Sequence, residues 1–496
     1  MTLGQLLDET ARRTPEAVAL ICGESRVSYA ELSQSTAALA GWLLAQGLQP
    51  GDRVALHWAN SIEIVQLYFA CFKAGLIAVP INQRLKAPEV AYMLAHAEAS
   101  ICFSQPELAP VARQAIELNG STIPILTKLP GSRHEALPVV DPTAPCAILY
   151  TSGTTARPKG VTHTQSSLLH AARLMLEMVG DAGPVALSTT PLTHTSGLMA
   201  LLLPCVLQGW THVLLPSFDS AQTLDAIQAH AVTYSGGLPA MASMMVEEQI
   251  RRSRRTGSLR VFISGGDSVP LSLQQQVSSV FGLPVLELIG MTESCPVMWN
   301  TSDDVRAGSV GRPRNGVEVK LVPLIGDDSD AGEIAVRSPA NFSGYWRDPE
   351  ATAATVRDGW LYTGDLARRD DDGYYWFAGR LKQLIIRGGS NIAPQQVEEV
   401  LLQHPAVLEA GVIGLPDPVW GQTVAAFVSL REGASVSANE LQDFARQYLA
   451  DYKVPESIWF TGRLPKGPTG KVDRRSLASV AASQSNAALQ VQEAAV

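Results

Sequence analysis

The run from Leu149 to Gly160, LYTSGTTARPKG, constrains this chain more than any other stretch. It follows an apolar run, Cys146 to Leu149, that predicts the end of a buried strand, and it precedes helical spacing at Leu168 to Leu176. Glycine lets backbone N–H groups approach an anion, hydroxyls can donate to phosphate oxygens, and Lys159 adds a positive charge. A plain surface turn is the alternative for the TSGTT core alone. The whole run favours a phosphate-binding loop.

This run is similar to the signature loop of the adenylate-forming superfamily, which includes acyl-CoA synthetases, peptide-synthetase adenylation domains and luciferases. The family loop reads approximately Y/F-T-S-G-S/T-T-G-x-P-K-G, and this chain departs from it at Ala156. A Walker-type loop is excluded because G-x-x-x-x-G-K-S/T is absent. Further family motifs follow in the family's order from about Leu3 to Leu477. The resemblance implies that the following residues bind ATP: Thr151, Ser152, Gly153, Thr154, Thr155 and Lys159.

Composition sets further limits. The 496 residues are enough for a large domain and a smaller one. Apolar content of 46% and charged content of 17% fit a globular protein. The net charge of -9 argues against a nucleic-acid partner, which would need clustered Lys and Arg. The one basic cluster, Arg251 to Arg255, is interpreted as a solvated helix end, with a partner or phosphate site as the alternative.

The spacing of the cysteines, histidines and apolar residues bears on the cellular compartment and on metal binding. The 6 cysteines lie far apart without a C-x-x-C pair, which predicts reduced residues in a cytoplasmic protein. The histidines lack zinc-site spacing. The N-terminus carries charges such as Asp8 and Arg12 and lacks the apolar core of a signal peptide. The most apolar run, Gly197 to Leu207, contains Pro204 and predicts a buried helix, so we expect no integral membrane segment.

Helical and strand periods alternate through the first part of the chain. Ser28 and Glu31 form a predicted capping box that opens a helix ending near Gly47. Strand periods follow at Val54 to His57 and at Ile77 to Pro80. Repeated strand and helix units imply parallel-rich sheets with flanking helices, so the predicted fold class is α/β.

The resemblance also implies the domain organisation. We expect an adenylate-forming N-terminal domain at 1–381 and a small mobile C-terminal domain at 382–478, with the hinge near Lys382. Helical periods at Val397 to Leu402 and strand periods at Val407 to Val412 predict an α+β architecture for the small domain. The tail at 479–496 is rich in Ala, Ser and Gln and is expected to be flexible.

The segment that contains Gly265 and the segment that contains Gly290 each follow an apolar run that predicts a strand. Both therefore lie at strand ends, where open α/β sheets bind ligands. The resemblance assigns Gly265 and Gly266 to the adenine wall, Thr292 to the α-phosphate and Glu293 to Mg²⁺. A hydroxyl can donate to a phosphoryl oxygen, and Mg²⁺ prefers carboxylate oxygen with phosphates and waters. In isolation, Glu293 would pass for a helix-start carboxylate. The nucleotide-binding residues implied by these segments are Gly265, Gly266, Asp267, Gly290, Met291, Thr292 and Glu293.

Two further motifs concern the nucleotide. Tyr362 to Asp365 resembles the family's ribose motif, and a carboxylate can accept from both hydroxyls of a cis-diol. Arg380 resembles the arginine that reaches the nucleotide. In isolation Arg380 and Lys382 would each pass for a surface charge.

The carboxylic acid would meet a separate group of residues. His194 lies in a P-L-x-H-x-x-G segment that lines the acyl pocket in the family, although on spacing alone it is more often a packing residue. The resemblance places the following residues at this pocket: His194, Thr195, Gly236, Gly237 and Leu238. Fatty and aryl acids are both compatible with them, and the sequence slightly favours the fatty or general acyl class.

The acceptor thiol would meet the small domain. Gly388 and Gly389 resemble a loop that borders the pantetheine channel, and Trp420 is a candidate to stack on the CoA adenine, with a core or turn role as the alternative. Lys471, in a Gly/Pro-rich loop, aligns with the lysine that is essential for adenylation in the family.

These residues together predict an ATP-dependent acid–thiol ligase that uses ATP, Mg²⁺ and coenzyme A. Catalytic roles fall to Lys471, Thr292 and Glu293. CoA is the favoured acceptor because the chain carries no fused carrier domain. The alternatives are an enzyme that loads a carrier-protein thiol, a luciferase-like oxygenase, and a degenerate AMP-binding regulator. The oligomeric state stays open, with a homodimer among the alternatives.

Overall fold

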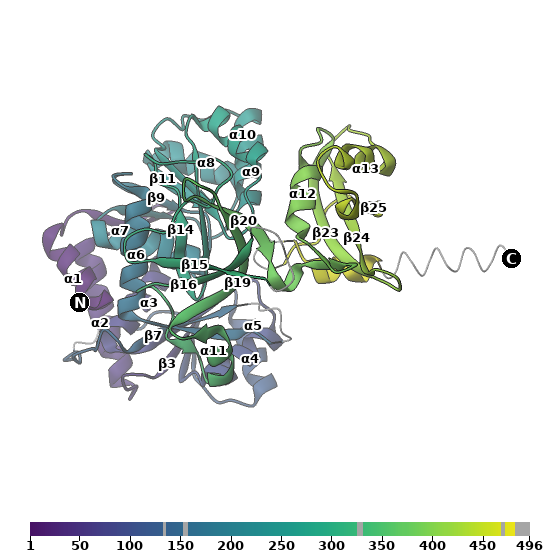
Figure 1. Cartoon of the computed structure of the whole chain (residues 1–496). Coiled ribbons are helices and arrows are strands. Elements are labelled where there is room, and N and C mark those ends of the chain that lie inside the picture. The colour runs from purple at the N-terminus through teal and green to yellow at the C-terminus, as the bar shows by residue number, and fades with distance from the viewer. Residues whose placement is uncertain (132–134, 152–156, 325–330, 468–471, 482–496) are drawn as a thin grey trace. The chain divides into compact units, whose positions relative to one another are not determined.

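The computed structural model describes residues 1–131, 135–151, 157–324, 331–467 and 472–481 (Figure 1). By its internal contacts the chain falls into two compact units. The first unit consists of Met1–Gly266, Leu273–Val319 and Val336–Leu361. The second consists of Asp267–Ser272, Lys320–Ala335 and Tyr362–Val496. The domain boundary expected near Lys382 stays a prediction.

Two mixed sheets organise the first unit. The larger has the strand order β14-β13-β12-β11-β9-β10-β1-β2, with parallel pairing from β13 to β1. The other has the order β17-β8-β7-β4-β3-β5-β6, with parallel pairing from β7 to β6. The parallel-rich α/β architecture predicted from the sequence is confirmed. The strands of the larger sheet are β1 (Val18–Cys22), β2 (Ser25–Ser28), β9 (Val185–Ser188), β10 (Thr211–Leu214), β11 (Tyr234–Gly237), β12 (Val261–Gly265), β13 (Val285–Met291) and β14 (Ser294–Trp299). Those of the other sheet are β3 (Arg53–His57), β4 (Ile77–Ile81), β5 (Ile101–Ser104), β6 (Ile125–Leu126), β7 (Pro145–Thr151), β8 (Lys159–Thr164) and β17 (Gly344–Tyr345).

Helices cover these sheets, and local sequence explains where they begin and end. The Ser28 side chain accepts from the Glu31 backbone, and the Glu31 side chain accepts from the Ser28 backbone, so the predicted capping box of α2 is confirmed. Helix α3 ends at Gly75, whose φ of 72° is readily adopted only by glycine. α3 packs against α1 and α2, and α5 packs against α4 (Figure 1). The helices up to Thr355 are α1 (Leu3–Arg13), α2 (Tyr29–Ala45), α3 (Ile62–Ala74), α4 (Ala87–Ala97), α5 (Ala109–Asn119), α6 (Gln165–Val179), α7 (Leu203–Gln208), α8 (Ser220–His230), α9 (Pro239–Arg251), α10 (Leu271–Phe281) and α11 (Pro349–Thr355).

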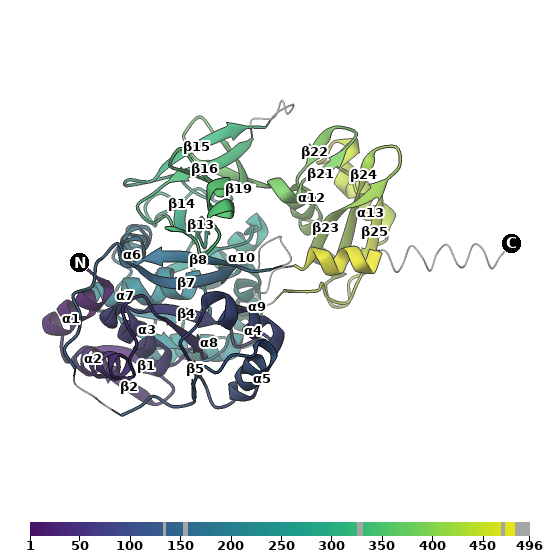
Figure 2. The same ribbon diagram turned by 90° about the horizontal axis from the view of Figure 1, so that it is seen from below.

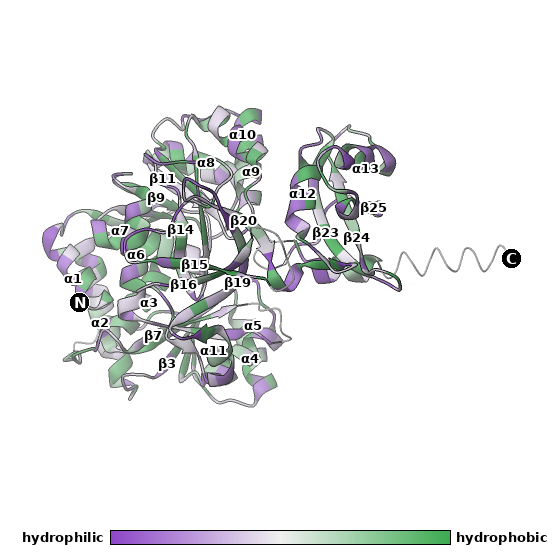
Figure 3. Cartoon of the chain, viewed as in Figure 1, coloured by the Kyte–Doolittle hydropathy of each residue, from purple (hydrophilic) through white to green (hydrophobic). Residues whose placement is uncertain are grey.

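The apolar run at Gly197 to Leu207 is a buried helical segment, as predicted. It forms a π-helix over Ser196–Leu202 and continues as α7, and nearly all of its side chains are buried. Figure 3 shows α7 mostly in the hydrophobic colour, whereas α13 (Ala438–Arg446) is largely hydrophilic. Within the described ranges, no helix combines the length and the hydropathy needed to cross a bilayer.

Later strands form two smaller sheets. One has the order β15-β16-β19-β18 with β20 on β19, and the other has the order β22-β21-β24-β23 with β25 on β24. α12 (Pro394–Leu402) and α13 cover the latter sheet with a shared apolar core, which confirms the α+β character expected there. The described residues 474–481, including three residues expected in the tail, are helical. The strands are β15 (Glu318–Pro323), β16 (Gly332–Arg337), β18 (Val356–Arg357), β19 (Trp360–Arg369), β20 (Tyr375–Arg380), β21 (Ile385–Arg387), β22 (Ser390–Ile392), β23 (Val407–Asp417), β24 (Gly421–Leu430) and β25 (Ser457–Phe460).

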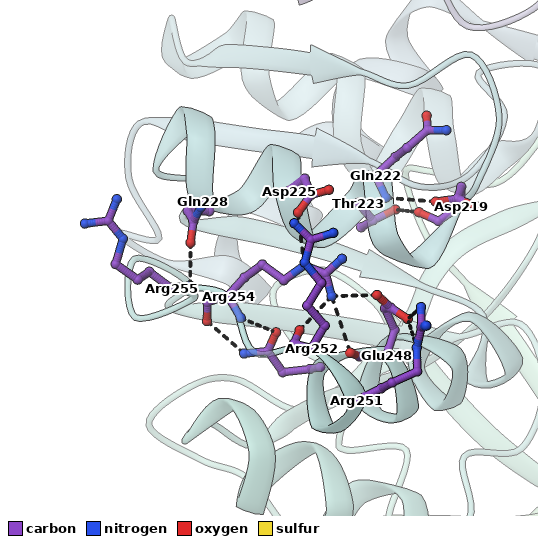
Figure 4. A network of polar contacts seen from close by, with 11 residues as sticks. Asp219, Gln222, Thr223, Asp225, Gln228, Glu248, Arg251, Arg252, Arg254 and Arg255 are labelled. Carbon is purple, nitrogen blue, oxygen red and sulfur yellow. Dashed lines mark hydrogen bonds and ion pairs between the residues drawn. The ribbon is translucent and has the colours of Figure 1, made fainter.

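The basic cluster at Arg251 to Arg255 is exposed at the end of α9, as interpreted, except at Arg254. Arg254 is only 6% exposed. Its guanidinium pairs with Glu248 at 2.7 Å and with Asp225 at 3.0 Å (Figure 4). Because Glu248 lies near the end of α9 and Asp225 lies in the middle of α8, Arg254 joins two packed helices, and these two carboxylates balance its charge.

Candidate functional site

The predicted phosphate loop connects two antiparallel strands. Thr151 at the end of β7 pairs with Lys159 at the start of β8, and Figure 2 shows β7 and β8 next to each other. The sequence predicted only a helix after the loop, so β8 was missed. Its partners explain why, since it pairs with β7 on one side and with the distant β17 on the other. The loop residues Ser152, Gly153, Thr154 and Thr155 lie outside the described residues.

The Lys159 ammonium lies over an aromatic ring. Its Nζ is 4.6 Å from the ring centroid of Tyr345, which comes from β17. An ammonium over a phenol ring is attracted by the negative face of the π-system. Tyr345 therefore supports the lysine that closes the loop.

Thr292 and Glu293 form the turn between β13 and β14, because Met291 and Ser294 on either side pair with each other. The Thr292 carbonyl lies 2.7 Å from Nε2 of His163 on β8. The Thr292 hydroxyl accepts from the Thr195 hydroxyl at 3.2 Å. The turn is thus held from two sides, at the carboxyl end of β13, the last parallel strand before the antiparallel edge strand β14.

The Glu293 carboxylate is buried and oriented. Glu293 is 6% exposed, and its Oε1 accepts from the Tyr345 hydroxyl at 2.7 Å. The Glu293 carbonyl accepts from the Phe342 backbone at 2.8 Å. Burial, and then the Glu293 charge, raise the pKa of Tyr345, so this phenol stays a hydrogen-bond donor.

The glycines assigned to the adenine wall allow close backbone approach. A Cβ at Gly265 would lie 2.6 Å from the Leu288 carbonyl, so β12 and β13 can pair closely only with glycine there. Gly266 has a φ of 80°, which favours glycine. Gly290 and Met291 end β13, whereas Asp267 belongs to the second unit and accepts from the Ser268 backbone.

The residues assigned to the acid pocket lie at the ends of β9 and β11. His194 Nδ1 is 2.9 Å from the Ser196 hydroxyl. A Cβ at Gly236 would lie 2.1 Å from the Ile263 side chain, so strand packing accounts for this glycine by itself. A Cβ at Gly237 would lie 3.0 Å from the Thr189 hydroxyl. Leu238 precedes α9 as its N-cap residue.

The second unit contains the residues assigned to the ribose. Asp365 on β19 pairs in register with Arg380 at the end of β20. Its carboxylate lies 2.9 Å from Arg380 Nε, and the Asp365 backbone donates to the Thr363 hydroxyl. Lys382 lies in the short 3-10 helix Leu381–Gln383 that follows.

The residues assigned to CoA also lie in the second unit. Gly388 and Gly389 form the turn between β21 and β22, with φ of 55° and 85°. A Cβ at Gly388 would lie 2.9 Å from the Trp420 ring. Trp420 is 51% exposed, and Arg387 lies over its ring at 5.9 Å, so the indole is a surface platform and not a core residue.

The predicted catalytic residue Lys471 lies outside the described residues. The chain on either side of its loop is paired, since Lys466 and Val472 form an antiparallel bridge. Lys466 itself lies 2.5 Å from Glu409.

Two family models match this chain. Residues 7–346 match the model of the AMP-binding enzyme family, and residues 396–471 match that of the AMP-binding enzyme C-terminal domain. The chain belongs to the AMP-binding enzyme family. Its motifs therefore have the family origin that the sequence resemblance implied.

Similar proteins cover nearly the whole of this AMP-binding enzyme. A feruloyl-CoA synthase from Amycolatopsis sp is 37% identical over 483 residues, covering 95% of this chain and 97% of its own. A long-chain-fatty-acid–CoA ligase from Bacillus subtilis is 31% identical over 528 residues, covering 96% and 94%. The crystal structure of an anthranilate CoA ligase with anthranoyl-AMP matches with a TM-score of 0.90 at 28% identity, covering 97% of both chains. The protein is an AMP-forming acid–thiol ligase of the acyl-CoA synthetase type.

Within the first unit, the structure brings together Thr195, Thr292 and Glu293 by direct contacts. Tyr345 links Glu293 to Lys159. His163 holds the Thr292 carbonyl in the same group. The sequence analysis predicted a role for neither Tyr345 nor His163. The sequence carries no local signal for either residue, because the partner of each is far along the chain. His163 contacts Thr292, 129 positions away. Tyr345 contacts Glu293, 52 positions away.

Proposed function

We propose that this AMP-forming ligase converts an aromatic carboxylic acid, ATP and CoA into an aryl-CoA thioester, AMP and pyrophosphate. The observation that carries the adenylation step is the turn that presents the Thr292 hydroxyl and the Glu293 carboxylate together at the end of β13. A donor for phosphoryl oxygen and a carboxylate for a divalent cation are the two groups that adenylation needs at one place.

The aromatic class is favoured by the more similar relatives. The feruloyl-CoA synthase is 37% identical, against 31% for the fatty-acid ligase, and the anthranilate ligase has a closely similar structure. The sequence alone slightly favoured a fatty or general acyl acid, so this proposal departs from that preference. The acid would lie near His194, Thr195 and the segment from Gly236 to Leu238.

In the first half-reaction, a carboxylate oxygen of the acid attacks the α-phosphorus of ATP. The bond from that phosphorus to the bridging β-oxygen breaks, and pyrophosphate leaves. Positioning and charge carry such a reaction, because the protein forms no covalent bond to the phosphoryl group. We assign the Thr151 to Lys159 loop to the leaving phosphates, Thr292 to the α-phosphate, and Lys471 to the carboxylate and phosphate oxygens.

The residues present fit a magnesium ion. In the described part of the chain, no three His, Cys, Asp or Glu side chains gather as a metal cage. Mg²⁺ bound with nucleotides commonly takes one or two carboxylates together with phosphates and waters, so the single buried Glu293 matches that mode. Bound there, the ion would supply positive charge to the phosphates, and Tyr345 would keep the carboxylate oriented.

The remaining assignments concern the nucleotide and the second half-reaction. Asp365 and Arg380 would hold the ribose, and the segments at Gly265 and Gly290 would border the adenine. A rotation about Lys382, between domains at 1–381 and 382–478, would withdraw Lys471 and bring Gly388, Gly389 and Trp420 to the acyl-adenylate. The CoA thiolate then attacks the acyl carbon, and AMP leaves.

The test is pyrophosphate release by the purified protein with ATP and Mg²⁺, across aromatic and fatty acids, with and without CoA. We expect release that depends on an aromatic acid and turns over only with CoA. Turnover with fatty acids alone would contradict the substrate class. A single burst of pyrophosphate per enzyme that a pantetheinylated carrier protein relieves, but free CoA does not, would show that the acceptor is a carrier protein.

A further inference from the structure

His163 makes a contact with the Thr292–Glu293 turn that none of the assignments above uses. It lies on β8, and its Nε2 is 2.7 Å from the Thr292 carbonyl. A carbonyl oxygen only accepts hydrogen bonds, so Nε2 must carry the hydrogen and donate it. Nδ1 is then an acceptor, and the Ser167 hydroxyl lies 3.0 Å from it. The two contacts fix both the tautomer and the orientation of the ring.

The surroundings keep this imidazole neutral and still. The side chain is completely buried, and burial lowers the pKa of His163 to about 4. Ser167 is the third residue of α6, and its backbone and hydroxyl exchange hydrogen bonds with Thr164, the N-cap residue. The ring therefore rests on the first turn of α6 and on β8 at the same time.

The contact acts on the peptide group that joins the two functional residues. Holding the Thr292 carbonyl fixes the plane of the peptide bond between Thr292 and Glu293, because that bond is planar. Thr195 holds the Thr292 hydroxyl at 3.2 Å, and Tyr345 holds the Glu293 carboxylate at 2.7 Å. His163 supplies the backbone anchor between these two side-chain anchors.

We propose that His163 is a positioning residue for adenylation, which holds the Thr292–Glu293 turn in the orientation that serves the α-phosphate and the magnesium ion. The inference rests on the function proposed above. Groups that stabilise a transition state act best when they are already in place, and a displacement of about 1 Å can cost about 100-fold in rate. His163 contacts the Thr292 carbonyl and the Ser167 hydroxyl, so it would act through the turn.

The test compares two substitutions that differ in hydrogen bonding. His163→Leu fills similar space but cannot donate, whereas the side-chain amide of His163→Gln can donate to the same carbonyl. We expect His163→Leu to lower kcat for acid-dependent ATP–pyrophosphate exchange about 10- to 100-fold with little change in the KM of the acid. We also expect it to need more Mg²⁺ for half-maximal rate, and His163→Gln to recover most of both losses.

A matched control separates positioning from general loss of stability. His57 is another completely buried histidine, on β3, with its Nδ1 3.1 Å from the Ser104 hydroxyl and no role assigned in the site. His57→Leu should lower the Tm but leave the kcat of the folded protein and its Mg²⁺ dependence unchanged. Thioester formation from a supplied acyl-adenylate, which uses neither ATP nor Mg²⁺, should be unaffected in both Leu variants.

The outcomes are decisive in each case. Unchanged kcat and Mg²⁺ dependence in His163→Leu would overturn the inference, as would equal loss of the thioester step. If His163→Leu does not fold, His163→Gln and Ser167→Ala take its place: a pyrophosphate-exchange defect in Ser167→Ala with normal thioester formation would support the inference, and its absence would overturn it. Absence of exchange in the wild-type protein would instead reject the proposed function itself.

Discussion

The hydroxyl of Tyr345 donates a hydrogen bond to the Glu293 carboxylate at 2.7 Å, while the ring of the same residue lies under the Lys159 ammonium at 4.6 Å. One side chain thus contacts the residue assigned to magnesium and the residue that closes the phosphate loop. The two assignments belong to distant parts of the sequence. A side chain on β17 connects them, which gives that short strand a function.

Tyr345→Phe keeps the ring under Lys159 and removes only the donor to Glu293. Hydrogen bonds to charged groups contribute about 1.5–3 kcal/mol, so we expect the rate of adenylation to fall about tenfold or more. The Mg²⁺ concentration for half-maximal pyrophosphate exchange should rise. Tyr448→Phe, at a tyrosine that is 58% exposed, is the control and should change neither quantity. A normal Mg²⁺ dependence in Tyr345→Phe would argue that the hydrogen bond serves folding alone.

Gly388→Ala is expected to slow the second half-reaction selectively. Gly388 has a φ of 55°, and a Cβ there would lie 2.9 Å from the Trp420 ring, so alanine must push the indole out of place. Tryptophan fluorescence should change, and CoA-dependent thioester formation should slow, while acid-dependent pyrophosphate exchange stays normal. Gly433→Ala provides the comparison, because its φ of 75° imposes similar backbone strain with no atom within 4 Å of the added Cβ. If both substitutions slow thioester formation equally, backbone strain alone would explain the effect of Gly388→Ala.

Lys471→Ala should separate the two half-reactions in the opposite sense. Loss of the ammonium removes the charge assigned to the carboxylate and phosphate oxygens, so acid-dependent pyrophosphate release should be abolished. Thioester formation from a supplied acyl-adenylate should survive. Lys466→Ala removes a lysine on the flank of the same loop that pairs with Glu409, and it should preserve both activities. Equal loss of both half-reactions in Lys471→Ala would remove the reason for assigning this lysine to one step.

Sequence reasoning succeeded where the signal is local. The capping box at Ser28 and Glu31 is specified within a few residues, and it is confirmed. Strand β8 was missed, and it pairs with the preceding β7 on one side and with Gly344 and Tyr345, far along the chain, on the other. The contacts of Thr292 with His163 and Thr195 are equally non-local. The motifs identified the reacting groups, whereas the residues that hold those groups are set by tertiary packing.

Buried neutral histidines should make this protein lose stability in mild acid. Burial lowers the pKa of His57 to about 4 and that of His212 to about 3, whereas both would titrate near 6.5 in the unfolded chain. Between these values the unfolded state binds more protons than the folded state, so the free energy of unfolding falls as pH decreases from about 6.5. Each such histidine contributes about 1.4 kcal/mol per pH unit over that range.

His212 offers a way to isolate one of these contributions. Its Nε2 lies 2.8 Å from the Ser188 hydroxyl, between two central strands of the larger sheet. His212→Leu should make the plot of unfolding free energy against pH shallower by about 1.4 kcal/mol per unit between pH values of about 4 and 6, measured by urea denaturation. Ser188→Ala removes the hydrogen bond but leaves the histidine buried, so its plot should shift in height and keep the wild-type slope. An unchanged slope in His212→Leu would mean that the unfolded chain does not gain this proton, and the acid sensitivity would then have to come from the other buried histidines or from carboxylates.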